Sequence, residues 1–364
     1  TLVDKRSAPG GHWLDAYPYV RLHQPASFYG VNSEKLETHS GDLSSKQEIL
    51  AYYSKVLYRM ENAGRVKFFG MMEHTGNGKV RSIADPNKKI KFEIKKCLVD
   101  STYMKVEVPS TTQPNFEVSK NVNLVPPNDL FSLSASYDRY NIIGAGKTAL
   151  DAICFLLDSG VPKEKVYWFV SRDSWFWNRE IVQPPLVGKA FLALLNAVNN
   201  NNLTDEAFLD LEKIGNVFRL DKDIRPTKWK CATISKKELE TVRKIQNVIR
   251  KGRVKKVSNN NIFLERGKEQ NTERSITVDC SACGLASRPK KKIFSENSII
   301  LQSTMMCQQV FSASIIAKIE SSNLGVGEKN ALVSPVSHPE VVDDLPECLF
   351  QSFKNLDQVN RKFP

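Results

Sequence analysis

The 364-residue chain contains no run of 18 or more apolar residues, so no stretch of it is expected to span a bilayer as a helix. Cysteines are few: their odd number, seven, and their scattered spacing suit a reducing compartment better than a disulfide framework. The first residues lack the charged and apolar regions of a secretory signal, and we expect a cytoplasmic protein. A composition of 41% hydrophobic and 25% charged residues excludes global disorder and collagen-like repeats.

The formal charge of +12 indicates either a basic solvated surface or an anionic partner, such as a phosphorylated cofactor or a nucleic acid. No RNP, zinc-finger or helix-turn-helix signature accompanies this charge, so we expect a small-molecule substrate and no nucleic acid. The pair Cys280-x-x-Cys283 lacks the second pair or nearby histidine that would complete a metal set, and no metal is expected. Because it ends a strand rather than opening a helix, we interpret it as structural and find no redox dithiol.

Hydrophobic periodicity divides the chain into two units. In the first, residues 46–62 carry the stripe of an amphipathic helix, with Asp42 and Ser44 as candidate caps, and 66–72, 79–83 and 89–94 predict an antiparallel meander, followed by a short strand at 96–100. In the second, a strand at 140–143, a helix at 147–159 and a strand at 166–170 form a βαβ unit, which favours a parallel sheet. Further helices are expected at about 188–200, 204–214, 235–250 and 308–321, and further strands at about 253–257, 261–265 and 275–280.

The motif Gly144-x-Gly146-x-x-Ala149 lies directly after a predicted strand and opens a predicted helix. The first glycine allows the tight turn, and the second lets a pyrophosphate approach the backbone. The helix N-terminus, at Lys147 and Thr148, then presents free N–H groups and a positive dipole end to phosphates. This context predicts dinucleotide binding, with a merely structural turn as the alternative.

The residues after the next strand indicate which dinucleotide binds. In NAD sites an acidic residue there holds the ribose 2′-OH, whereas here the strand ends in Ser171-Arg172-Asp173. A guanidinium at this point pairs well with a 2′-phosphate, and Ser171 adds a donor. The sequence therefore favours NADP, although Asp173 leaves NAD open. The alternative without a function is that Arg172 simply faces solvent.

A second constellation lies near the start of the chain. Asp4 ends a strand-like segment and is followed, after five residues, by Gly10-Gly11-His12-Trp13. An acid at the end of a strand holds an adenosine ribose, and a glycine pair beyond it lets backbone pass close to a flat or phosphorylated ligand.

This stretch resembles the second-strand signature of two-dinucleotide flavoproteins, the flavin-containing and Baeyer–Villiger monooxygenases and their relatives of the pyridine nucleotide-disulfide oxidoreductase-like superfamily. The segments 17–25 and 29–33, the glycine motif at 144–151 and the strand-like run 278–284 resemble one branch of them. The resemblance implies an α/β fold of two nested Rossmann-like dinucleotide-binding domains in three-layer arrangements, with an antiparallel β-meander. It implies a first part of an FAD-binding domain at 1–136, an inserted NAD(P)-binding domain at 137–274, and a return segment with a C-terminal tail at 275–364.

The resemblance also implies the cofactors and their contacts. Residues expected at FAD or NAD(P) are Asp4, Gly10, Gly11, Trp13, Arg21, Gln24, Gly144, Gly146, Lys147, Thr148, Ser171, Arg172 and Gly284. In the family, an earlier glycine motif holds the FAD pyrophosphate; none precedes Asp4, and we expect an N-terminally truncated fragment. No catalytic residue is assigned, although His23 is a candidate proton donor facing the flavin or else a satisfied polar residue.

The implied function is an FAD-dependent, NAD(P)H-using oxidoreductase of monooxygenase type, in which hydride passes from NADPH to flavin and then to oxygen or another acceptor. Two alternatives stay open. One is a non-catalytic or defective dinucleotide-binding protein, and the other is a flavin reductase that passes electrons to a disulfide or quinone.

Overall fold

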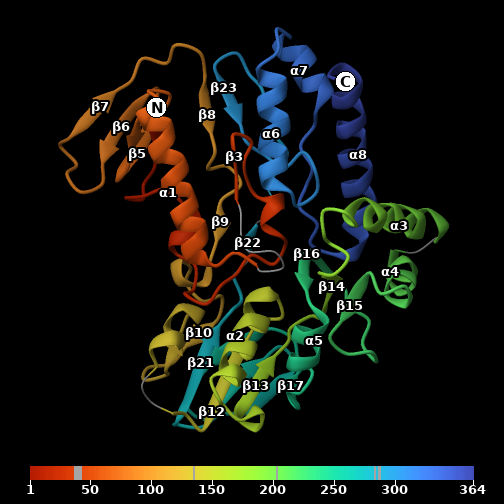
Figure 1. The fold of residues 1–364 in the computed structure, drawn as a ribbon. Coiled ribbons are helices and arrows are strands. Elements are labelled where there is room, and N and C mark those ends of the chain that lie inside the picture. The colour runs from red at the N-terminus through yellow and green to blue at the C-terminus, as the bar shows by residue number, and fades with distance from the viewer. Residues whose placement is uncertain (37–42, 134–135, 202–203, 283, 286–287) are drawn as a thin grey trace.

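The computed structural model describes residues 1–36, 43–133, 136–201, 204–282, 284–285 and 288–364 (Figure 1). A five-stranded parallel sheet lies at one end of the molecule, whereas both termini and the helices α6, α7 and α8 lie at the other. The strand order is β11-β21-β12-β13-β17. Its strands are β11 (Leu124–Val125), β12 (Arg139–Ile143), β13 (Val166–Phe169), β17 (Asn247–Ile249) and β21 (Ser275–Asp279).

The βαβ unit predicted at residues 140–170 is confirmed. β12 is buried along its whole length, and α2 (Lys147–Asp158) packs on the sheet through Ala149, Leu150 and Ile153, none of them more than 1% exposed. β12 and β13 pair in parallel, so their carboxyl ends meet at one edge of the sheet. β11 and β21 belong to the same sheet although they lie just outside residues 137–274.

Beside the parallel sheet lies a three-stranded sheet of β14 (Ser174–Asn178), β15 (Val217–Arg219) and β16 (Lys228–Ile234). None of these three strands was predicted from the sequence, although Trp175 and Trp177 were expected to serve packing, or an adenine-side wall, rather than chemistry. Both indoles lie in a buried cluster with Trp229 and Phe208. The helices α3 (Val187–Asn200), α4 (Thr204–Lys213) and α8 (Leu345–Lys362) complete this cluster.

In the first unit, α1 (Lys46–Asn62) is confirmed, but its cap is Ser45, in a capping box with Glu48, and not Ser44; Asp42 lies outside the described residues. The expected first meander strand divides at Met71, whose φ is +54°. β4 (Phe68–Phe69) pairs in parallel with β1 (Leu2–Val3), and the meander consists of β5 (Met72–Gly76), β6 (Lys79–Ser82) and β7 (Lys89–Lys91).

The other strands form small sheets. β8 (Leu98–Asp100) pairs with β23 (Ser298–Ile300), β9 (Val106–Glu107) with β22 (Gly284–Leu285), and β2 (Gly30–Val31) with β3 (Glu34–Lys35). A fourth sheet contains β10 (Glu117–Val118), β18 (Val254–Val257), β19 (Asn261–Leu264) and β20 (Gly267–Gln270). The predicted helix at 235–250 is too long: α5 (Lys236–Val242) ends early because the chain then supplies edge strand β17. Two further helices are α6 (Gln309–Glu320) and α7 (Val326–Leu332).

Candidate functional site

The loop between β12 and α2 brings backbone close to an open space. Gly144 has φ = +130°, and a Cβ there would lie 2.9 Å from the carbonyl oxygen of Cys280. A Cβ on Gly146 would meet no described atom within 4 Å. No side chain of the described residues caps the first turn of α2, so its N–H groups are available to an anion beside Gly146. The loop therefore fits a pyrophosphate.

Lys147 opens α2, but its ammonium is already paired. It forms ion pairs with Asp151 and, at 2.9 Å, with Glu238 of α5. Burial acts to lower the pKa of Lys147, yet the two carboxylates hold it above its usual value, so the side chain is charged. What Lys147 and Thr148 offer to a nucleotide is the backbone of the first turn.

The carboxyl end of the adjacent strand carries the residues expected at the adenosine ribose. Arg172 is exposed and makes no hydrogen bond or ion pair within the described part of the chain, and Ser171 beside it is half-buried. Asp173 is buried and accepts two hydrogen bonds from Arg250, Nε to Oδ2 at 3.0 Å and Nη2 to Oδ1 at 3.1 Å. Its carboxylate is therefore engaged inside the protein, while the guanidinium of Arg172 is available.

Glu238 connects the glycine loop to other elements. Its Oε2 accepts from Nη1 of Arg179 at 2.5 Å, and Nε of Arg179 donates to the carbonyl of His23 at 2.9 Å. Although burial acts to raise the pKa of Glu238, Lys147 and Arg179 hold it well below its usual range. Tyr17 donates to Asp151 at 2.6 Å, so residues 17–23 are tied to both α2 and α5.

His23, the candidate proton donor, is half-buried and accepts at Nδ1 from the backbone N–H of Thr233 at 3.3 Å. Burial, with Lys147 and Arg179 nearby, lowers the pKa of His23 to about 3. The ring is therefore neutral at pH 7. A group of this pKa does not act as a general acid near neutrality.

The titration of His23 has a consequence for stability. In the unfolded chain histidine has a pKa of about 6.5, so between pH 6.5 and 3 the unfolded state binds more protons than the folded state. We expect stability to fall as the pH drops through this range, by at most about 1.4 kcal/mol per pH unit for one proton. The free energy of unfolding, measured with urea at several pH values, should fall less steeply with pH in His23→Asn than in wild type. Asparagine keeps an acceptor for the N–H of Thr233, so the variant removes the titration and not the contact. Parallel slopes would contradict the assignment.

The N-terminal constellation lies beside α1. Asp4 follows β1 directly, and its Oδ1 accepts the backbone N–H of Arg6 at 2.8 Å. Oδ2 has no partner among the described residues. At Gly10 a Cβ would lie 2.5 Å from a leucine side chain of α1, so this glycine allows the segment to pack on the helix. A Cβ on Gly11, where φ is +56°, would meet nothing within 4 Å.

The remaining expected FAD contacts are dispersed. Trp13 is half-buried against the apolar cluster under α1, and Gly284 lies in β22 with φ = +64°. Arg21 is exposed and donates to the carbonyl of Leu43 at 2.8 Å. Gln24 is only 6% exposed and lines a cavity.

This cavity has a volume of about 1060 Å³ and lies between residues 24–36, residues 177–191 and the segment 305–314. Trp177, Val182, Phe191 and Met305 give it a largely apolar lining, with Gln24 and Arg179 among the polar groups. Its volume is at the upper end of that of small-molecule sites. Two cysteines of its wall form a disulfide, a single bridge that the scattered cysteine spacing did not indicate.

Several residues of the site were not predicted from the sequence. Glu238 and Arg179 are 59 positions apart, and neither belongs to a recognisable motif; the one local signal is the capping box that Ser235 and Glu238 form at the start of α5. Cys283 lies outside the described residues, and Cys280 is a free, buried thiol.

Among the described residues no group of three or more potential ligands could hold a metal, and no helix is long and apolar enough to cross a membrane.

Solved structures with this arrangement define the class of fold. A crystal structure of cyclohexanone monooxygenase in an open form aligns with a TM-score of 0.56 and 12% identity, covering 90% of this chain and 83% of that one. The cyclohexanone monooxygenase from Rhodococcus sp. Phi1 bound to NADP+ aligns with 0.55 and 12%, covering 90% and 78%. The chain therefore shares the fold of these two monooxygenase structures, which confirms the predicted α/β class with Rossmann-like domains.

Similarity in sequence points to mycobacterial proteins. Uncharacterized proteins of Mycobacterium bovis and of two strains of Mycobacterium tuberculosis are each 37% identical over 355 residues, 93% of this chain. The chain spans 66% of the length of these curated relatives. No family model matches it.

Proposed function

We propose that the chain is the dinucleotide-binding part of an FAD-dependent oxidoreductase that uses NAD(P)H, with NADPH preferred. The observation that carries this proposal is the edge where β12 and β13 end side by side. There the open Gly146 loop and the uncapped start of α2 adjoin Arg172, an arginine that has no partner among the described residues. Ligands of parallel α/β sheets bind beyond the carboxyl ends of the strands, so this edge is the expected site.

Different residues bind different parts of the nucleotide. The backbone N–H groups of Lys147 and Thr148 hold the pyrophosphate, and the absence of a Cβ at Gly146 lets it approach. Arg172 and Ser171 hold the 2′-phosphate. For FAD, the free Oδ2 of Asp4 fits a ribose hydroxyl.

When both cofactors are bound, they supply hydride transfer from NADPH to flavin and electron transfer onward to oxygen or another acceptor. The protein positions the reacting rings and excludes water. The cavity at Gln24 gives room for an acceptor, because its apolar walls keep bulk water away from an uncharged compound. A monooxygenase and a reductase share these requirements.

The engagement of Asp173 with Arg250 supports NADP over NAD. A 2′-phosphate adds about two negative charges, and a guanidinium meets them with two charge-assisted hydrogen bonds of about 1.5–3 kcal/mol each. Solvent exposure of Arg172 reduces the gain to roughly 2 kcal/mol, or about thirtyfold in affinity. Arg172→Ala should weaken NADPH by this factor and leave NADH nearly unchanged, as followed by fluorescence titration.

Arg172→Lys is expected to restore only part of the NADPH affinity, because an ammonium keeps the charge and loses the planar fork. If Arg172→Ala lowers the affinities for NADPH and NADH equally, the side chain binds the pyrophosphate that both nucleotides share or supports the fold. The NADP assignment would then be wrong.

The function itself is tested by NADPH consumption. FAD is added in excess, because no earlier glycine motif precedes Asp4 to hold its pyrophosphate. We expect the chain with this FAD to oxidise NADPH in air faster than free FAD does, and Arg172→Ala to lower this rate at limiting NADPH. Tight NADPH binding without any oxidation would instead favour the non-catalytic alternative.

A further inference from the structure

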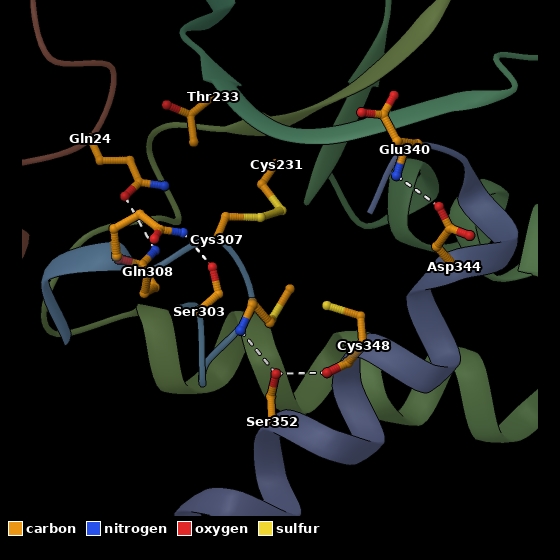
Figure 2. The surroundings of a disulfide bond; sticks show 12 residues. Gln24, Cys231, Thr233, Ser303, Cys307, Gln308, Glu340, Asp344, Cys348 and Ser352 are labelled. Carbon is orange, nitrogen blue, oxygen red and sulfur yellow. Dashed lines mark hydrogen bonds between the residues drawn. A yellow bond between two sulfur atoms is a disulfide. The ribbon is translucent and has the colours of Figure 1, made fainter. Parts of the chain in front are cut away.

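Cys231 and Cys307 form a disulfide although 76 positions separate them (Figure 2). Cys231 lies in β16, and Cys307 directly precedes Gln308, which occupies the N-cap position of α6. Both cysteines line the cavity of about 1060 Å³. The bond therefore joins two walls of the chamber in which a small molecule has room to bind.

The backbone at Cys231 departs from a regular strand. Trp175 pairs with Trp229 and Trp177 with Thr233, so β16 uses two more residues than β14 between these pairs. Cys231 lies within this bulge and has φ = +57°, in the left-handed region. Bulges of this kind re-aim a side chain next to functional sites. Here the bulge explains why a strand residue faces the cavity.

The segment that carries Cys307 is held from the opposite side. The hydroxyl of Ser352 in α8 accepts the N–H of Met306 at 2.9 Å and donates to the carbonyl of Cys348 at 2.6 Å (Figure 2). Met306 has φ = +41°, another left-handed residue beside the disulfide. The position of the second sulfur is thus set by α8 independently of its bond to β16, so reduction is not expected to release the segment.

The other described cysteines differ from this pair in their position and in their chemistry. Burial raises the pKa of Cys154 and of Cys348 to about 12, and raises that of Cys280 well above its usual value. Neither these three nor Cys97, the fourth described free thiol, lines the cavity. Cys307 is half-buried whereas Cys231 is 6% exposed, so Cys307 is the more exposed residue of the pair.

We propose that the Cys231–Cys307 disulfide is a redox-active site for thiol–disulfide exchange, and that its partner is an uncharged dithiol, or the corresponding disulfide compound, admitted through the cavity. The largely apolar lining favours an uncharged partner over a charged thiol. This inference requires neither a bound flavin nor a bound nucleotide, so it stands independently of the proposed function.

The exchange balances as follows. A thiolate of the dithiol attacks Sγ of Cys307, the S–S bond breaks, and Cys231 leaves as a thiolate that takes up a proton. The second thiol of the reagent, as its thiolate, then attacks the reagent sulfur of the mixed disulfide, and Cys307 leaves as a thiolate that is protonated in turn. The protein gains two electrons and two protons, and the dithiol becomes a cyclic disulfide. The reverse reaction oxidises the cysteine pair.

The test uses the whole chain in its oxidised form and dithiothreitol as the uncharged dithiol. Samples are quenched with acid and alkylated, and the free thiols at Cys231 and Cys307 are counted by mass spectrometry. We expect both thiols to appear together while circular dichroism shows native helix content, and oxidised dithiothreitol to restore the same pair. Thiols that appear only in denaturant would overturn the proposal, because the disulfide would then be a structural cross-link.

Access through the cavity is tested by narrowing it. Val310 lies in α6 and lines the cavity, so Val310→Trp should slow the reduction severalfold; Val187→Phe, on the α3 side, provides a second variant if the first does not fold. Ile214→Trp, at a residue 64% exposed and outside the cavity, is the matched control and should leave the rate unchanged. Equal rates in folded cavity variants and in the control would overturn the proposed route. Cys307→Ser should abolish the exchange.

Discussion

Replacement of Gly146 by valine is expected to abolish NADPH binding while the fold survives. The extended backbone at this position, with φ = −91°, accommodates a β-branched residue, and a Cβ meets no described atom within 4 Å. The added side chain instead fills the space beside the α2 N-terminus that a pyrophosphate needs. We expect a loss of at least about 3 kcal/mol, more than a hundredfold in affinity. Fluorescence titration with NADPH measures it.

Two other glycines sharpen this experiment. Gly327→Val in α7 also places a side chain where no described atom lies within 4 Å, and should leave NADPH affinity unchanged. Gly144→Val is a different case, because φ = +130° and the Cys280 carbonyl at 2.9 Å strain the backbone itself. That variant should lose stability as well as binding. Unchanged NADPH affinity in Gly146→Val would remove the glycine loop from the site.

Replacement of Glu238 by alanine is expected to cost about 3 kcal/mol of unfolding free energy. The loss has two parts: Lys147 and Arg179, with side chains only 17% and 12% exposed, lose a shared carboxylate, and α5 loses its capping box. Urea unfolding should show a lower midpoint with an unchanged slope. Glu240→Ala, at an exposed position of the same helix, is the control and should change stability by less than about 0.5 kcal/mol.

The same carboxylate predicts a pH dependence. Its folded-state pKa is held below the unfolded value of about 4.3, so its contribution is complete above that pH and is lost as the pH falls below it. In Glu238→Gln this part of the acid destabilisation should disappear. If wild type and Glu238→Gln lose stability equally between pH 5 and 3, the carboxylate is not the group responsible.

The parts of the site that could be predicted from the sequence are those formed by residues that are neighbours along the chain. The requirements of Gly144, Gly146 and α2 lie within a few consecutive residues, because a tight turn and a helix start are built from neighbours. The same holds for α1 and for the βαβ unit. The strand β14 was missed because five successive buried residues show no alternation, and its partners β15 and β16 lie about 40 and 55 positions further along the chain.

The parts that could not be predicted depend on contacts between distant segments. Nothing near Asp173 indicates that Arg250 binds its carboxylate, so the sequence left NAD open, and the contact that supports the proposal of NADP is made only by the fold. Likewise Cys231 and Cys307 lie 76 positions apart without a recognisable spacing, so the sequence did not indicate that they pair. In both instances the tertiary structure, not local propensity, decides which polar groups remain available to a ligand.

The position of Glu238 between Lys147 and Arg179 has a thermodynamic consequence. One end of this bridge is the first residue of α2 at the nucleotide loop, and the other end lines the cavity. A compound that displaces Arg179 from the carboxylate would alter the pairing of Lys147 and, through it, the first turn of α2, so we expect the two proposed sites to share a coupling free energy. Linkage then requires reciprocity: whatever factor NADPH applies to the affinity of a cavity ligand, that ligand applies to the affinity of NADPH. In Glu238→Ala both factors should approach one together.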